Sequence, residues 1–141
     1  METETAVILK ERFVTLLFDP AIPCLHSEWN QGVTSERFRQ VVLHMKDYIL
    51  RHSSQYPHIQ MLTDIRKIGT VKREDAEWVA KEVDPVLHQA GMRKVAFVVP
   101  ENVFTMLSVQ NYQQQTHQQN DDVIQTRVFR EVAEAKQWLK E

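Results

Sequence analysis

The chain has 141 residues, a length typical of one domain, and residues 1–141 are expected to form a single folded unit. Hydrophobic residues make up 43% and charged residues 26%, which excludes a disordered chain, a collagen and a coiled-coil rod. The 17 Lys and Arg nearly balance the 19 Asp and Glu, for a formal charge of −2. This balance argues against nucleic-acid binding, because such affinity needs clustered positive charge.

The cysteine content and the apolar runs indicate a cytoplasmic protein. Cys24 is the only cysteine, so no intrachain disulfide can form, and its neighbours Pro23 and Leu25 favour a buried structural thiol over a nucleophile. The segment from Met1 to Ala6 lacks the pattern of a signal peptide. The longest apolar runs, such as residues 95–100, fall far short of the about 20 residues of a membrane-spanning helix. We expect at most peripheral membrane contact.

The first third of the chain predicts an antiparallel meander. Apolar, β-branched and aromatic residues fill three short segments. Residues typical of turns follow the first segment, at Glu11-Arg12, and the third, at Asn30-Gln31-Gly32. The three predicted strands are Ala6 to Lys10, Phe13 to Phe18 and Cys24 to Trp29. A helix follows, capped by Thr34 or Ser35 and ending within 52–57. Its apolar stripe at helical spacing contains Phe38, Val41, Val42, Met45 and Ile49.

The rest of the chain alternates strands and helices. The predicted strands are Ile59 to Ile65, Lys94 to Val99 and Thr126 to Phe129, and the predicted helices begin at Thr70, near Val103 and at Glu131. The unbroken apolar run in the strand from Lys94 indicates burial on both faces, as in a parallel sheet. The sequence therefore predicts an α/β fold: a mixed sheet, antiparallel in its N-terminal meander and parallel in its later βα units, flanked by about four helices.

Two residues are expected to kink and to end the second helical region. Pro85 lies inside the helix that begins at Thr70 and should kink it, because the proline ring clashes with the preceding turn. Gly91 suits the left-handed position at which a helix stops.

Motifs that carry chemistry are missing. The sequence has no glycine-rich phosphate loop and no G-x-S-x-G elbow, and its six histidines form no zinc-ligand spacing. We therefore expect no catalytic residue, no metal ligand and no cofactor.

A polar group after the fourth predicted strand is the first candidate binding site. Asp64 lies at the carboxyl end of this strand, where open α/β sheets place their ligands, and Arg66 and Thr70 follow in the same loop. The alternative is structural: Asp64 pairs with Arg66 or Lys67, or accepts hydrogen bonds from loop N–H groups. Trp78 either packs in the core or forms a wall of a pocket near this loop.

The helix near Val103 to Gln113 is the second candidate. Phe104, Met106 and Leu107 spread over more than one face of it, so the helix is either buried on two sides or presents an apolar surface to a partner, a lipid or a ligand.

The order and spacing of residues over most of the chain resemble the bacterial SpoIIAA-like proteins, which share the STAS-type α/β fold and are often described together with the CRAL-TRIO lipid-binding domain. The residues that carry this resemblance are Trp29, Gly32, Thr34-Ser35-Glu36, Phe38-Arg39, Leu62, Asp64, Asp75, Trp78, Pro85, Leu87, Gly91, Arg93, Ala96-Phe97-Val98, Phe129, Glu134-Ala135 and Trp138-Leu139.

The resemblance implies a mixed sheet flanked by helices, no enzymatic activity, and binding of a protein partner, an apolar ligand or the membrane surface. A homodimer is also common in such domains. One feature departs from the regulatory STAS proteins of the anti-anti-sigma type, which carry a phosphorylatable serine in an Asp-Ser-Ser-Gly-like stretch at a helix start. Here Thr70 has no preceding Asp-Ser, so it is first of all a helix cap.

Three functions remain open at this point. The favoured one is a non-catalytic regulatory or protein-interaction module of STAS type with an unknown partner. The alternative is a carrier or sensor of a lipid-like apolar small molecule, with the helix from Val103 as its lid. A small enzyme with Asp64 or His26 as base ranks last, and it would need two titratable groups that converge in a deep cleft.

Overall fold

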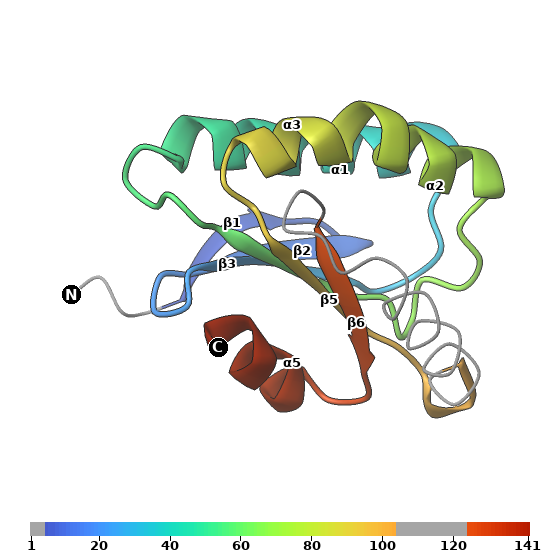
Figure 1. Ribbon diagram of the computed structural model, residues 1–141. Coiled ribbons are helices and arrows are strands. Elements are labelled where there is room, and N and C mark those ends of the chain that lie inside the picture. The colour runs from blue at the N-terminus through green and yellow to red at the C-terminus, as the bar shows by residue number, and fades with distance from the viewer. Residues whose placement is uncertain (1–4, 104–123) are drawn as a thin grey trace.

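A six-stranded mixed sheet forms the centre of the computed structural model, which describes residues 5–103 and 124–141 (Figure 1). The strands lie side by side in chain order; β1, β2 and β3 pair antiparallel, and β3 to β6 pair parallel. Their bounds are β1 Ala6–Lys10, β2 Val14–Asp19, β3 Cys24–Trp29, β4 Gln60–Asp64, β5 Lys94–Val98 and β6 Gln125–Phe129. The predicted fold class, with its antiparallel meander followed by parallel βα units, is confirmed.

The first helix, α1, spans Ser35–His52 and begins where the sequence predicts. Thr34 caps it, because the hydroxyl oxygen of Thr34 accepts a hydrogen bond from the backbone N–H of Arg37 at 3.2 Å. The predicted apolar stripe faces the sheet, and its buried members are Val41, Val42, Met45 and Ile49.

The second helical region begins later than predicted and is disturbed just before Pro85. Thr70 does not begin the helix; α2 spans Arg73–Trp78, with Lys72 at its cap position. A π-helical turn, η1 Val79–Val83, then leads into α3 Asp84–Gln89. The disturbance expected at Pro85 takes this form, because proline lacks an N–H and its ring crowds the carbonyl one turn earlier, and a wider turn relieves both. Gly91 ends the region at a φ of +110°, as predicted.

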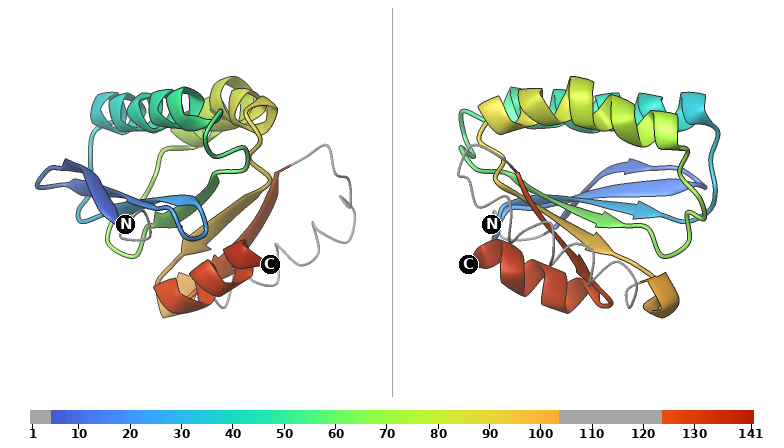
Figure 2. Two further views of the ribbon diagram at one scale, coloured as in Figure 1. Left: turned by 90° about the vertical axis from the view of Figure 1, so that its left-hand side faces the viewer. Right: turned by 45° about the vertical axis from the view of Figure 1, so that its right-hand side comes forward.

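Two helical layers enclose the sheet (Figures 1 and 2). The helices α1, α2 and α3 cover one face, and the last helix, α5 Val132–Lys140, covers the other. The larger core lies under α1, and a second cluster packs α5 against the sheet with Cys24, Leu62 and Val98. Apart from Val103 itself, the helix predicted near Val103 to Gln113 lies outside the described residues. Within 5–103 and 124–141, no helix has both the length and the hydrophobicity to cross a membrane.

Candidate functional site

Asp64 is buried at the carboxyl end of β4, and Arg66 holds it there. Only 4% of Asp64 is exposed. The guanidinium of Arg66 donates from Nε to Oδ1 of Asp64 at 3.0 Å and from Nη2 to Oδ2 at 2.7 Å, and the backbone N–H of Arg66 donates to Oδ1 at 3.2 Å. The structural alternative stated for Asp64 is therefore present: the pair organises the turn that leaves β4. Asp64 raises the pKa of Arg66, first of all through this side-chain hydrogen bond.

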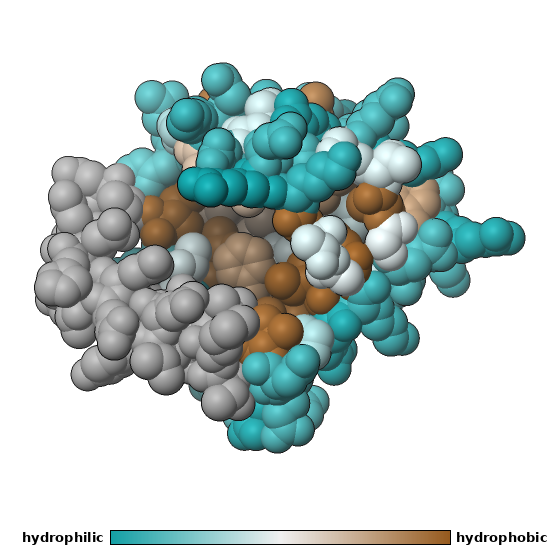
Figure 3. All heavy atoms as spheres, turned by 90° about the vertical axis from the view of Figure 1, so that its right-hand side faces the viewer, coloured by the Kyte–Doolittle hydropathy of each residue, from teal (hydrophilic) through white to brown (hydrophobic). Residues whose placement is uncertain are grey.

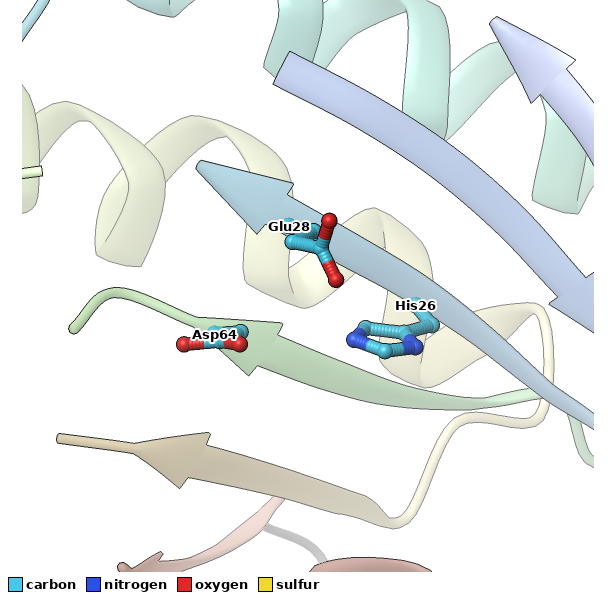
Figure 4. A group of neighbouring side chains, drawn as sticks. All are labelled: His26, Glu28 and Asp64. Carbon is cyan, nitrogen blue, oxygen red and sulfur yellow. The ribbon is translucent and has the colours of Figure 1, made fainter. Parts of the chain in front are cut away.

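His26 and Glu28 bring two further groups to Asp64 (Figure 4). All three side chains lie on the sheet face that α5 partly covers, because His26 and Glu28 are two residues apart on β3 and Glu28 is in register with Asp64 on β4. One imidazole nitrogen and one oxygen from each carboxylate lie within 4.8 Å of one another. In Figure 4 the imidazole and both carboxylates converge on a common point.

The surroundings of His26 favour its neutral form. Burial lowers the pKa of His26, and the positive charge of Lys136 lowers it further, while Glu28 and Asp64 act in the opposite direction. Lys136 itself is engaged elsewhere, since its Nζ donates to Oδ2 of Asp19 at 2.9 Å. A neutral imidazole offers one lone pair, and Nε2 of His26 is buried with no hydrogen-bond partner in the part of the chain that the structure describes.

Thr70 lines a separate pocket, on the face of the sheet that α1, α2 and α3 cover. This pocket has a volume of about 60 Å³ and is lined by Val33, Ser35, Phe38, Ile68, Thr70, Val71, Lys72 and Asp75. The structure therefore does not bring Thr70 to Asp64 and Arg66 as one polar site. Whether either group binds a ligand or a partner stays a prediction.

Asp75 is the polar centre of that second pocket. Its carboxylate accepts a hydrogen bond from the Ser35 hydroxyl at 2.7 Å and one from Nε of Arg39 at 2.9 Å. The hydrogen bond from Ser35 is the first cause that lowers the pKa of Asp75, and the Arg39 contact adds to it against the cost of burial. These bonds tie the start of α1 to α2.

Trp78 lies beside this network. The guanidinium of Arg39 sits 4.8 Å from the centre of the Trp78 ring, and the ring packs partly buried against the larger core. Trp78 thus packs against the core, and its role as a wall of a pocket stays a prediction. Of the remaining predicted site residues, Phe104, Met106 and Leu107 lie outside the described residues.

An apolar hollow opens on the side of the molecule where β4 and β5 end (Figure 3). Figure 3 shows apolar side chains exposed in it, between the helical layer above and the sheet below. Half-buried apolar residues at the ends of these strands and at the starts of α1 and α2 include Val33, Phe38, Ile65, Val71 and Trp78.

Sequence reasoning found the pairing of Asp64 with Arg66, but it missed the two neighbours of Asp64 on β3 and the network at Asp75. The signal for the first was His26-x-Glu28 within a strand, since residues two apart share a face, but the register of β3 against β4 cannot be obtained from one sequence. The prediction for Cys24 is confirmed: the thiol is buried, and burial raises its pKa to about 12.

The comparison with protein families identifies this architecture. The family model described as SpoIIAA-like matches residues 24–140, which contain β3, β4, the Asp64 group and the Asp75 pocket. No curated protein and no solved structure matches the chain. Because the family match covers most of the 141 residues, the chain belongs to the SpoIIAA-like family.

Proposed function

We propose that this chain is a non-catalytic, cytoplasmic regulatory module of STAS type that binds a partner protein. The observation that carries the proposal is the apolar hollow at the ends of β4 and β5. Membership in the SpoIIAA-like family supports it, because it indicates a STAS-type regulatory domain.

The borders of the hollow have the composition of a protein interface. On this side of the sheet, half-buried Val33 and Val71 line the pocket around Asp75, and the guanidinium of Arg39 stacks on the ring of Trp78. Aromatic residues and arginine contribute strongly to binding energy at interfaces. The bonds from Ser35 and Arg39 to Asp75 fix α1 against α2, so this surface needs little ordering when a partner binds.

A lipid-like ligand is the second candidate, and the same hollow favours it. An apolar molecule would bury its surface against these side chains. The two candidates differ in what accompanies the purified chain: a small molecule of lipid size or a second protein.

One substitution on the hollow and one away from it separate the outcomes. Val71→Lys places a charge on the pocket wall, whereas Val7→Lys alters a residue of β1 that is already 61% exposed. The tagged chain and both variants are used to capture proteins from lysate, followed by quantitative mass spectrometry. We expect a defined partner that Val71→Lys loses and Val7→Lys retains.

Native mass spectrometry of the same preparations reports bound small molecules and the number of subunits. An adduct of lipid size that Val71→Lys loses would support the carrier function instead. Identical capture by both variants, without such an adduct, would refute the hollow as the binding surface. If the partner is a second copy of this chain, the homodimer would appear at twice the mass of one chain.

A further inference from the structure

We propose that His26, Glu28 and Asp64 bind one divalent transition-metal ion of the first row, with Zn²⁺ as the representative. This site is separate from the apolar hollow and does not depend on the function proposed for it. Figure 4 shows the three side chains converging from two neighbouring strands.

The backbone already places the ligands. Glu28 and Asp64 are register partners on parallel strands, and His26 lies two residues before Glu28 on the same face. The candidate ligand atoms lie within 4.8 Å of one another. Ligand atoms around a tetrahedral Zn²⁺, at bond lengths of about 2.0–2.2 Å, are roughly 3.4 Å apart. Small side-chain rotations therefore complete the site, and the strands need not move.

The second observation is the unpartnered nitrogen of His26. The residue is only 6% exposed, and its Nε2 has no hydrogen-bond partner among residues 5–103 and 124–141. Buried polar atoms are nearly always paired, so an orphaned imidazole nitrogen calls for an explanation, and an ion is one. Figure 4 shows a ring nitrogen of His26 turned toward Asp64. A metal ion between them would take up the free lone pair.

Arg66 leaves room for the ion on Asp64. Oδ1 of Asp64 accepts two hydrogen bonds from Arg66, at 3.2 and 3.0 Å, but Oδ2 accepts only the one at 2.7 Å from Nη2. A carboxylate oxygen has two acceptor positions, so Oδ2 keeps one for a metal. The guanidinium would then act as the outer partner that orients a ligating carboxylate.

The donor set selects the class of ion. One imidazole nitrogen with two carboxylate oxygens suits Zn²⁺ and its first-row neighbours, whereas Mg²⁺ and Ca²⁺ are bound by oxygen alone. Glu28 and Asp64 carry two negative charges, one of which the guanidinium of Arg66 balances. Three protein ligands leave a coordination position for water or for a side chain of a partner protein.

The test is titration of the full chain, stripped with a chelator, with ZnCl₂ in isothermal calorimetry. We expect one Zn²⁺ per chain, and at least about tenfold weaker binding in Glu28→Gln and in His26→Asn. His88→Asn is the matched control, because His88 also has an unpartnered Nε2 but is not part of the three-residue group. Glu82→Gln controls for loss of an exposed carboxylate.

Cobalt gives an independent readout, since Co²⁺ in a protein site of nitrogen and oxygen ligands acquires visible absorption that the Glu28→Gln variant should lose. Because Glu28 is only half-buried, we expect Glu28→Gln to fold. This variant therefore tests the metal site even if His26→Asn fails to fold. No saturable binding, or binding that Glu28→Gln leaves unchanged, would overturn the proposal. Equal loss in His88→Asn would also overturn it, because the ion would then sit elsewhere.

Discussion

Two glycines with the same backbone requirement but different surroundings allow a sharp test of the fold. Gly69 has a φ of +79° and Gly91 a φ of +110°, a region in which a side chain is strained. A Cβ added at Gly69 would meet nothing within 4 Å. A Cβ added at Gly91 would lie 1.7 Å from the carbonyl oxygen of Pro57 and 2.9 Å from its carbon.

The magnitudes follow from this difference. Left-handed backbone costs an L-residue about 1–2 kcal/mol, so Gly69→Ala should lower the free energy of unfolding by about that much. Gly91→Ala carries the same cost, and its Cβ must also displace the backbone at Pro57. This movement would disturb the neighbouring hydrogen bond that the Gly91 carbonyl accepts from Nδ1 of His58 at 2.9 Å. We expect a loss of about 4 kcal/mol or more.

Urea unfolding at pH 7, followed by circular dichroism, measures the free energy of unfolding of both variants. For a chain of this size a loss of 1 kcal/mol lowers Tm by about 2–4 °C, so Gly91→Ala should melt about 10 °C or more below the parent. Losses within about 1 kcal/mol of each other would refute the reasoning, because they would mean that the segment at Pro57 gives way at little cost.

Three further predictions concern buried titratable groups. Asp75→Asn should lower the free energy of unfolding by about 2–3 kcal/mol, measured by urea unfolding, because Ser35 and Arg39 lose a charged acceptor. Asp84 has its pKa raised by burial from 3.8 to about 6, so its ionisation opposes folding as pH rises through this window. Asp84→Asn should therefore stabilise the chain by up to about 3 kcal/mol at pH 7 and by only about 1 kcal/mol at pH 4.5. Cys24, whose thiol pKa is about 12, should react with a thiol reagent only when the chain is unfolded, and fast labelling of the folded chain would contradict its burial.

Most of the fold could be predicted because the local signals are strong. The strands Ala6–Lys10 and Cys24–Trp29 have the predicted bounds, and the capping of α1 by Thr34 depends on residues within one turn. The start of α2 could not be predicted in this way. Thr70 is a good cap by type, but the chain turns through Gly69 at positive φ, and the helix begins three residues later, at Arg73.

The candidate sites were less predictable, because they depend on which strands become neighbours and in what register. Asp64 could be singled out from its place at the end of a strand. Its neighbours on β3 could not, since a shift of β3 by one residue would turn His26 and Glu28 to the opposite face of the sheet. The observed register sends Trp29 to the core under α1 and Glu28 to Asp64. The burial of Trp29, only 2% exposed, thus helps to hold the register that creates the polar group. A substitution that loosens Trp29 should for this reason weaken metal binding at His26 although it touches none of the three ligands.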